Sequence, residues 1–346
     1  MGDYGIFRMW EEDARTVYSH LQDEESRKLF DLKNRLIFEP YIEEWISEIC
    51  SMYKDWIPEP LIRDNRDSIV IYGTGHDGMM FLKMLRSFDI TPKCFCETEP
   101  GKTDRICNID IYAVNETLDD DKNIYLIASD KYRHEMYHYL REKGVGKERI
   151  YIPEYKYPMA LRGNQYFDLF TPGDEEIFVD AGAYNGDSIE RFITWSKDKM
   201  RGAYAIEPDP AMCEVMKEKF VNYNFRICRG GAWQSNDELR FSGMDTATHM
   251  DPDGEVAVKG IMIDDLNEIG TPTFIKMDIE GVELNALRGA SRVIRENAPR
   301  LAICVYHKPN DIVELGKYIL DLVPEYKFWI RQYTSLIYET VLYASV

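Results

Sequence analysis

Two stretches of the chain have residues whose types and spacing could bind a cofactor. Phe178 to Ser188 reads FVDAGAYNGDS, and Ile69 to Gly78 reads IVIYGTGHDG. Each is an apolar segment followed by a glycine-rich turn and then a helical pattern, which is the usual way to place a nucleotide-like ligand at a helix N-terminus. The residues between the glycines differ, so we expect the two turns to bind different ligands.

The later turn carries two carboxylates, Asp180 and Asp187, around a predicted helix start. A helix N-terminus has a partial positive charge and attracts phosphate, whereas two acids there disfavour phosphate and favour a cationic ligand. S-adenosylmethionine has a sulfonium, an ammonium and no phosphate, so it fits this turn. Glu207, at the end of the next strand in AIEPDP, is placed to accept hydrogen bonds from both ribose hydroxyls. Each acid alone is equally well explained as a helix cap or a solvated loop residue.

Candidates for catalysis follow two later strands. Asp278 ends one predicted strand and His307 follows another in CVYHKPND, so both lie at the carboxyl edge of the sheet. Strand alternation puts Lys276 and Asp278 on one face, where their charges partly offset each other. Glu280 follows the strand end by two residues. Glu283 falls in the first helical turn, where stabilisation by the helix dipole is the simpler interpretation.

The earlier turn, Gly73-x-Gly75-x-x-Gly78, matches the dinucleotide fingerprint, and Glu97 or Glu99 stands where a ribose-binding acid is expected. The block is too short to supply the second mononucleotide-binding half that NAD needs. Three interpretations stay open: a purely structural turn, a nucleotide or nucleotide sugar at these three glycines, and a dinucleotide. We predict that no dinucleotide binds here.

The order of predicted elements indicates an α/β protein with two Rossmann-like parallel-sheet domains. Residues 1–63 form a helical N-terminal segment, residues 64–157 a small Rossmann-like domain, and residues 158–346 a second α/β domain. The last two strands, YKFWIRQY and TVLYASV, have no helix between them and predict an antiparallel hairpin. In the helical segment, YIEEWISEICSMYKDW has an apolar face that either packs on a neighbouring element or forms a homodimer interface.

Residues from about 176 to the C-terminus resemble the FkbM-type family of class I methyltransferases. The similarity is carried by FVDAGAYNGDS, AIEPDP, IDDL at 263–266, FIKMDIEGVELNALRGA at 274–290 and the closing ETVLYA. It implies methylation of sugar or polyketide-type hydroxyls with S-adenosylmethionine. Residues 64–157 look like the small Rossmann domain that precedes some sugar-modifying transferases.

The predicted cofactor site gathers residues from several strand ends of the C-terminal domain. Trp233, in GGAWQS, lies where class I methyltransferases place residues around the adenine, although it is equally consistent with a core position. The full set is Asp180, Ala181, Gly182, Asn185, Gly186, Asp187, Ser188, Glu207, Pro208, Ala232, Trp233 and Asp278.

An alcohol becomes a good nucleophile only as its proton is removed, so methyl transfer to oxygen is aided by a base near the sulfonium. We predict His307 or Asp278 as this base, with Glu280 orienting the hydroxyl group. No obligatory metal is expected, although the clustered carboxylates leave a Mg²⁺-assisted reaction open. The acceptor is expected to be a small molecule or carbohydrate, selected by loops such as SGMDTATHMDPDG at 242–254.

Charge and composition narrow the function classes. The chain has 42 basic and 61 acidic residues, a formal net charge of −19, which disfavours nucleic acid and acidic membrane surfaces as partners. The seven scattered cysteines suggest reduced thiols, and no apolar run is long enough to cross a bilayer, so a cytoplasmic protein is expected. The favoured function is a SAM-dependent O-methyltransferase. A ligand-sensing protein that retains the SAM fold is the alternative, and an NAD-dependent oxidoreductase is disfavoured.

Overall fold

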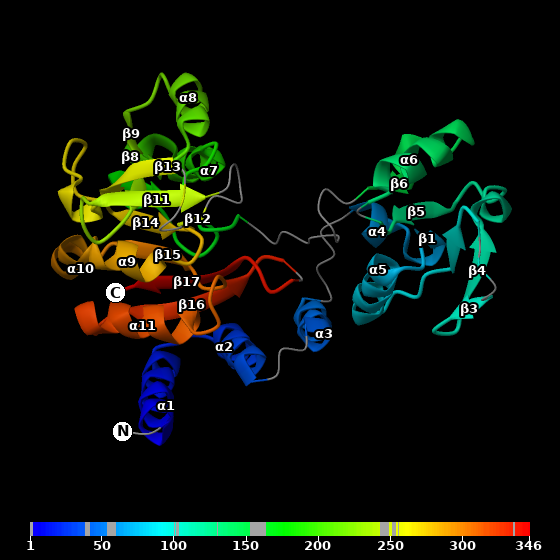
Figure 1. Ribbon diagram of the computed structural model, residues 1–346, viewed down its shortest axis with the longest axis horizontal. Helices are drawn as coiled ribbons and strands as arrows, with labels where there is room; N and C mark the ends of the chain where they lie inside the picture. The colour runs from blue at the N-terminus through cyan, green and yellow to red at the C-terminus, as the bar shows by residue number, and fades with distance from the viewer. Residues whose placement is uncertain are drawn as a thin grey trace. The chain divides into compact units, whose positions relative to one another are not determined.

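The computed structural model describes residues 3–38, 42–53, 60–99, 101, 104–129, 131–152, 164–242, 249–250, 254, 256–334 and 336–346. The chain divides into two compact units, each with its own sheet (Figure 1). Unit 1 comprises Met1–Glu39, Gly163–Gln332 and Tyr338–Val346, and unit 2 comprises Pro40–Arg162 and Tyr333–Ile337. The helical residues within 1–63 are therefore shared between the two units.

Unit 1 is built on a seven-stranded sheet in the order β16-β17-β15-β14-β7-β8-β9. All of its strands run parallel except β17, which is antiparallel to both of its neighbours. This is a class I methyltransferase fold, and the predicted terminal hairpin is confirmed, with the last strand inserted beside β15. The strands are β7 (Glu176–Ala181), β8 (Met200–Glu207), β9 (Phe225–Arg229), β14 (Phe274–Met277), β15 (Arg300–Cys304), β16 (Lys327–Gln332) and β17 (Thr340–Ser345).

Helices cover this sheet, and its central strands are buried on both faces. Every residue of β7 and β14 is buried, as expected for parallel strands between helical layers. Phe178 of β7 stacks on Phe192 at 4.7 Å between ring centroids, which anchors the helix that follows the turn predicted to bind the cofactor. The helices are α7 (Asp187–Ser196), α8 (Pro210–Lys219), α9 (Glu283–Arg288), α10 (Ser291–Asn297) and α11 (Asp311–Leu322), with 3₁₀ turns η4 (Lys197–Lys199) and η6 (Ile263–Asp265).

The first two helices, α1 (Asp3–Ser19) and α2 (Glu24–Phe38), belong to unit 1 and pack beside α11 and the edge strand β16 (Figure 1). The hydroxyl of Ser26 accepts a hydrogen bond from the Ile330 amide at 2.9 Å, and Arg331 pairs with Asp23 at 2.6 Å. These contacts cover a strand edge that would otherwise present unpaired backbone groups.

A smaller sheet in unit 1 has the order β10-β13-β11-β12. Its strands are β10 (Gly231–Ala232), β11 (Glu238–Ser242), β12 (His249–Met250) and β13 (Val256–Ile261). β11 and β13 pair antiparallel and are joined in sequence by the polar loop at 242–254 and β12. Of that loop, residues 243–248 and 251–253 lie outside the described residues, as does residue 255.

Unit 2 has a six-stranded sheet in the order β3-β4-β2-β1-β5-β6, parallel except where β3 meets β4. Its strands are β1 (Ile69–Tyr72), β2 (Cys94–Glu97), β3 (Arg105–Ile106), β4 (Ile109–Ala113), β5 (Ile124–Ile127) and β6 (Ile150–Tyr151). Its helices are α3 (Ile42–Met52), α4 (Pro60–Asp64), α5 (His76–Ser87) and α6 (Arg133–Glu142), with 3₁₀ turns η1 (Arg66–Ser68), η2 (Val114–Thr117) and η3 (Lys147–Arg149).

The apolar face of α3 is used inside unit 2. Trp45, Ile46 and Ile49 are buried, and the helix packs against α5. Packing on a neighbouring element is therefore the better of the two interpretations of this amphipathic segment. The seven cysteines are free thiols, as predicted. Within the described ranges, no helix combines the length and apolar character of a membrane span.

We predict that Ser26→Ala destabilises unit 1 by about 1–3 kcal/mol, because the buried Ile330 amide loses its acceptor. Urea denaturation followed by circular dichroism measures the change in unfolding free energy. The matched control is Ser19→Ala on exposed α1 surface, which should stay within about 0.5 kcal/mol of the parent. Equal stability of the two variants would show that α2 does not dock through this hydroxyl.

Candidate active site

The turn between β7 and α7 is closely packed against the end of β14. Gly182 has a φ of +81°, and a Cβ there would lie 1.9 Å from the carbonyl oxygen of Asp278. Gly186, with a φ of +80°, is the N-cap of α7, and a Cβ there would lie 2.5 Å from the Phe220 ring. Both glycines are therefore required by backbone conformation and by space. The turn predicted to hold the cofactor and the predicted catalytic strand end are in contact.

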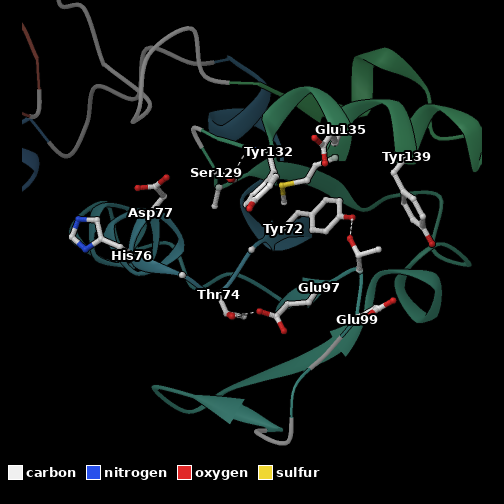
Figure 2. A pocket seen from close by; sticks show the side chains of 15 residues that line it. Tyr72, Thr74, His76, Asp77, Glu97, Glu99, Ser129, Tyr132, Glu135 and Tyr139 are labelled. Atoms are coloured by element: carbon white, nitrogen blue, oxygen red, sulfur yellow. Dashed lines mark hydrogen bonds between the residues drawn. The ribbon is translucent and has the colours of Figure 1, made fainter.

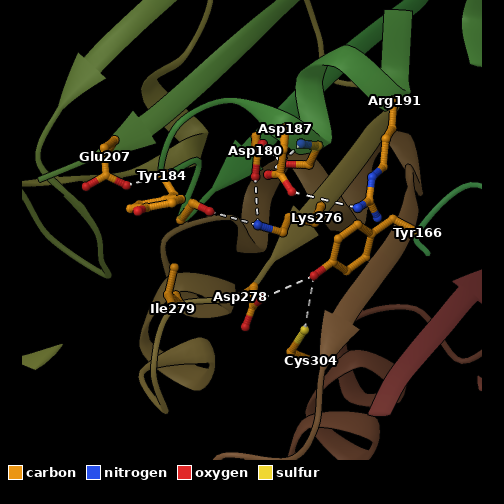
Figure 3. Close-up of polar contacts among 12 residues, drawn as sticks. Tyr166, Asp180, Tyr184, Asp187, Arg191, Glu207, Lys276, Asp278, Ile279 and Cys304 are labelled. Atoms are coloured by element: carbon orange, nitrogen blue, oxygen red, sulfur yellow. Dashed lines mark hydrogen bonds and ion pairs between the residues drawn. The ribbon is translucent and has the colours of Figure 1, made fainter. Parts of the chain in front are cut away.

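Asp180 and Lys276 form a buried ion pair beneath this turn (Figure 3). The Lys276 Nζ atom lies 2.9 Å from Asp180 Oδ1 and donates to the Gly182 carbonyl at 2.8 Å, while Ser188 donates to Asp180 Oδ2. Burial alone would lower the pKa of Lys276. The carboxylates of Asp180 and Asp278 raise this pKa by more than burial lowers it, so the ammonium stays charged.

This geometry changes the role expected for Asp180. From the sequence, Asp180 and Asp187 are both expected to favour a cationic ligand at the helix start. Asp180 is fully buried and its charge is balanced by Lys276, whereas Asp187 is exposed and lies 3.8 Å from Arg191. Asp180 therefore holds the turn in place, and only Asp187 presents its charge to the surface.

Glu207 ends β8 beside the same turn. Its Oε2 accepts from the Tyr184 amide and its Oε1 from the Asp209 amide, both at 2.8 Å. Burial raises the pKa of this carboxyl, and the two amide bonds oppose that effect. Each carboxylate oxygen keeps a further lone pair, so the group could accept two hydroxyls as well.

The other predicted cofactor residues surround these two strand ends. The Gly230 amide donates to the Glu207 carbonyl at 3.1 Å, which brings the segment that contains Trp233 next to Glu207. Asn185 accepts from the Asp187 amide at 3.1 Å within the turn. Ala181 and Ala232 are buried in β7 and β10, and Pro208 and Trp233 are half-buried at strand ends.

Asp278 is held by two tyrosine hydroxyls. Tyr306 donates to Oδ1 at 2.9 Å and Tyr166 donates to Oδ2 at 3.1 Å. Burial raises the pKa of this carboxyl, but Lys276, His307 and the Tyr306 hydroxyl together bring it below its usual value. Asp278 is therefore a firmly ionised hydrogen-bond acceptor and a weak base.

His307 lies between carboxylates on two sides. Its Nδ1 is 2.9 Å from Glu283 Oε1, and its Nε2 is 3.5 Å from Asp278 Oδ1 and 3.7 Å from Glu280 Oε2. Burial lowers the pKa of the imidazole, but the contact with Glu283 and the neighbouring negative charges raise it above 6.5. The structure thus brings the three predicted catalytic residues together.

Glu283 has a more specific position than the sequence suggests. It is 1% exposed, and its Oε1 also accepts from the Ile279 amide at 3.0 Å. It therefore orients His307 and fixes the turn after β14. In that turn Glu280 has a φ of +56°, a left-handed conformation that is uncommon outside glycine and is typical of functional sites.

Several site residues were missed by the sequence analysis. Tyr306 adjoins His307 in a quoted segment, and Glu339 opens the quoted ETVLYA, so a signal existed for both. Burial and the charge of Asp278 raise the pKa of Glu339, which accepts from Gln165 at 2.5 Å. Tyr166 stands in an irregular segment without a motif, and nothing in the sequence marks it.

Among the residues that the structure describes, one group of side chains could hold a metal ion. Ligand atoms of Glu283, His307 and Asp311 lie within 4.8 Å of one another. Asp311 also accepts from the Lys308 amide at 2.7 Å, and burial raises the pKa of its carboxyl to about 6. The expectation that no metal is required stays a prediction.

Comparison with known proteins places the site in a family, because residues 180–331 match the methyltransferase FkbM domain. The C-terminal part of this chain is an FkbM methyltransferase domain. The matched domain is that of a methyltransferase, the class of enzyme for which the sequence leads us to expect S-adenosylmethionine as cofactor. The matched segment contains the cofactor turn, Glu207, Asp278 and His307.

Solved structures similar to this chain include two methyltransferases. Methyltransferase FkbM from Methylobacillus flagellatus KT is 21% identical, covering 86% of this chain and 97% of its own, with a TM-score of 0.48. A SAM-dependent methyltransferase from Aquifex aeolicus is 16% identical, covering 50% and 84%, with a TM-score of 0.30. Aeropyrum pernix fibrillarin, with bound S-adenosyl-L-methionine, is 10% identical, covering 51% and 67%, with a TM-score of 0.34. No curated protein matches this chain.

The residues of the FkbM domain fit this cofactor. Because Gly182 and Gly186 have no side chains, the backbone of the turn can lie close to neighbouring atoms. The Glu207 carboxylate has the lone pairs that a ribose diol would need, and the turn has no lysine or arginine that would select a phosphate. The chemistry of this donor set suits a nucleoside with a cationic rather than an anionic tail.

We predict that Lys276→Met destabilises the domain by about 3–5 kcal/mol, because Asp180 is left as an uncompensated buried charge. Adding Asp180→Asn should recover part of the loss. The control is Lys217→Met, which removes an exposed pair with Glu214 and should cost less than about 1 kcal/mol. Chemical denaturation measures the unfolding free energy of all three variants. A loss of stability in Lys276→Met as small as that of the control would contradict the stabilising role of the buried ion pair.

Proposed function

We propose that the FkbM domain transfers the methyl group of S-adenosylmethionine to a hydroxyl of a sugar, a nucleotide-linked sugar or a related small metabolite. The observation that carries this proposal is the Glu283–His307 pair, with Nδ1 and Oε1 2.9 Å apart. It lies beside Asp278, whose carbonyl packs against Gly182 of the cofactor turn. A proton acceptor therefore lies next to the place where the methyl group is expected.

When bound, S-adenosylmethionine supplies an electrophilic methyl carbon on a sulfonium, and the leaving group is neutral S-adenosylhomocysteine. Glu207 would hold the ribose hydroxyls, and the turn from Gly182 to Gly186 would lie along the cofactor. Because the electrophile is already activated, the protein mainly aligns the acceptor oxygen and takes up its proton.

His307 is the better of the two predicted bases. With its proton on Nδ1, 2.9 Å from Glu283 Oε1, the neutral ring keeps its lone pair on Nε2, toward Asp278 and Glu280. The hydroxyl proton passes to Nε2 as the new oxygen–carbon bond forms. Asp278 is too weak a base for this step because its pKa is lowered, and it stabilises the imidazolium that results.

The surroundings of His307 suit a polyhydroxylated acceptor. Asp278 and Glu280 are hydrogen-bond acceptors for neighbouring hydroxyls, and the Glu280 side chain is 49% exposed, within reach of an incoming molecule. The formal net charge of −19 disfavours a polyanionic substrate. These features support an O-methyl acceptor of the sugar class.

The cofactor part of the proposal predicts that Glu207→Gln weakens S-adenosylmethionine binding about tenfold or more, because a charged hydrogen bond is worth about 1.5–3 kcal/mol. Isothermal titration calorimetry measures the affinity. Glu190→Gln, an exposed acid on α7, is the control and should bind normally. Unchanged affinity in Glu207→Gln would place the ribose elsewhere.

The catalytic part predicts that kcat/KM rises with pH and levels off above the raised pKa of His307, since only the neutral imidazole accepts a proton. In Glu283→Gln the rise should move to lower pH, toward 6.5, with a lower plateau, because the main contact that raises this pKa is lost. S-adenosylhomocysteine formation is measured with a panel of glycosides and nucleotide sugars.

The control for this series is Glu296→Gln, an exposed acid of α10, whose pH profile should match the parent. A profile that stays flat down to the acidic range would make Asp278 the base instead of His307. Loss of activity with EDTA, restored by Mg²⁺, would assign Glu283, His307 and Asp311 to a metal instead of to proton transfer.

A further inference from the structure

Unit 2 contains a cavity of about 660 Å³ at the carboxyl ends of β1, β2 and β5 (Figure 2). The chain leaves β1 toward β2 on one side and later returns to β5 on the other, so the crevice beside β1 is a topological switch point. Ligands of open parallel sheets bind at such points, and small-molecule pockets have volumes of about 300–1,000 Å³.

The three glycines of the turn beside this cavity are not equivalent. Gly73 has a φ of +115°, and a Cβ there would lie 2.8 Å from the Ala128 carbonyl oxygen. A Cβ at Gly78 would lie 2.1 Å from the Gly73 carbonyl oxygen. Both are explained by packing. Gly75, the N-cap of α5, has an ordinary φ of −67°, and a Cβ there would meet nothing within 4 Å. Its missing side chain leaves open space in the cavity wall.

The polar groups in the cavity are mainly hydrogen-bond acceptors. Glu97 ends β2 beside the turn, takes a hydrogen bond from the Thr74 hydroxyl, and has lone pairs left for two more donors. Three further acids, Asp77, Glu99 and Glu135, also contribute to the lining. Among the described lining residues there is no lysine or arginine, so the cavity favours hydroxyl donors over phosphate.

Aromatic side chains form another wall of the cavity. Tyr132 and Tyr139 come from the region of α6, and Tyr72 comes from the end of β1 (Figure 2). The Tyr139 hydroxyl is held by Asn115 at 3.2 Å and that of Tyr72 by Thr98 at 2.5 Å, which fixes both rings. Fixed aromatic rings beside carboxylates suit a ligand with a flat or ring-shaped apolar face and hydroxyls at its edge.

We propose that unit 2 binds a neutral ring with vicinal hydroxyls, either the ribose of a nucleoside or a pyranose sugar. Its diol binds to Glu97 and its edge approaches the backbone at Gly75. This differs from the nucleotide or nucleotide sugar that the sequence leaves open at the three glycines, because a phosphate would meet four carboxylates. The proposal does not depend on methyl transfer in unit 1.

Calorimetry on the full chain tests the site with uridine, methyl glucoside and methyl galactoside, and with UMP, UDP-glucose and NAD as the phosphorylated counterparts. Saturating S-adenosylhomocysteine is present so that the cofactor site of unit 1 does not contribute. We expect an unphosphorylated probe to bind more tightly than its phosphorylated counterpart. Binding of uridine would identify the diol as that of a ribose, and binding of a glycoside would identify it as that of a pyranose sugar.

Two variants locate the binding. Gly75→Val should abolish it by filling the open space, and Glu97→Gln should weaken it about tenfold. Glu142→Gln is the matched control for Glu97→Gln, because this exposed acid of α6 is outside the cavity lining. Thermal unfolding verifies that all variants fold. Tighter binding of a phosphorylated probe, no saturable binding of any unphosphorylated probe, or full affinity in Gly75→Val would overturn the proposal.

Discussion

The ion pair between Lys276 and Asp180 is the interaction on which the methyltransferase site depends. It joins β14 to β7 at neighbouring positions of the parallel ladder, where Lys276 and Asp180 are register partners. The same ammonium binds the Gly182 carbonyl, so it also sets the turn. Two buried charges are costly unless they are paired, and this cost excludes arrangements in which the strands slip or the turn opens.

The charge of Lys276 also affects the residues at the carboxyl edge of the sheet. It helps to keep Asp278 ionised, and Asp278 in turn contributes to the raised pKa of His307. Glu283 contributes more strongly to that shift through its contact with Nδ1. The proton affinity of the proposed base is therefore set by a chain of neighbouring charges that begins at the buried pair beneath the cofactor turn.

The sequence predicted the parts of this arrangement that depend on local pattern. Buried strands, glycine turns and the terminal hairpin each leave a signature within about ten residues, and strand ends of one parallel sheet must meet at one edge. The partners could not be predicted, because each contact joins distant segments. Tyr166 and Asp278 are 112 residues apart, and only the packing of an irregular segment brings them together. The balancing of Asp180 by Lys276 likewise follows from strand register, which the sequence pattern alone did not define.

The two glycine turns each join a parallel strand to a helix, but their surroundings differ. In the methyltransferase domain, Gly182 and Gly186 both face tightly packed atoms, and the strand-end acid before the turn is balanced by a lysine. In unit 2, Gly75 faces open space, and no lysine or arginine stands among the described residues of the cavity lining. The neighbouring strands therefore bring different charges to each turn. A glycine motif alone predicts a close backbone approach, and the charges around it determine which ligand can make that approach.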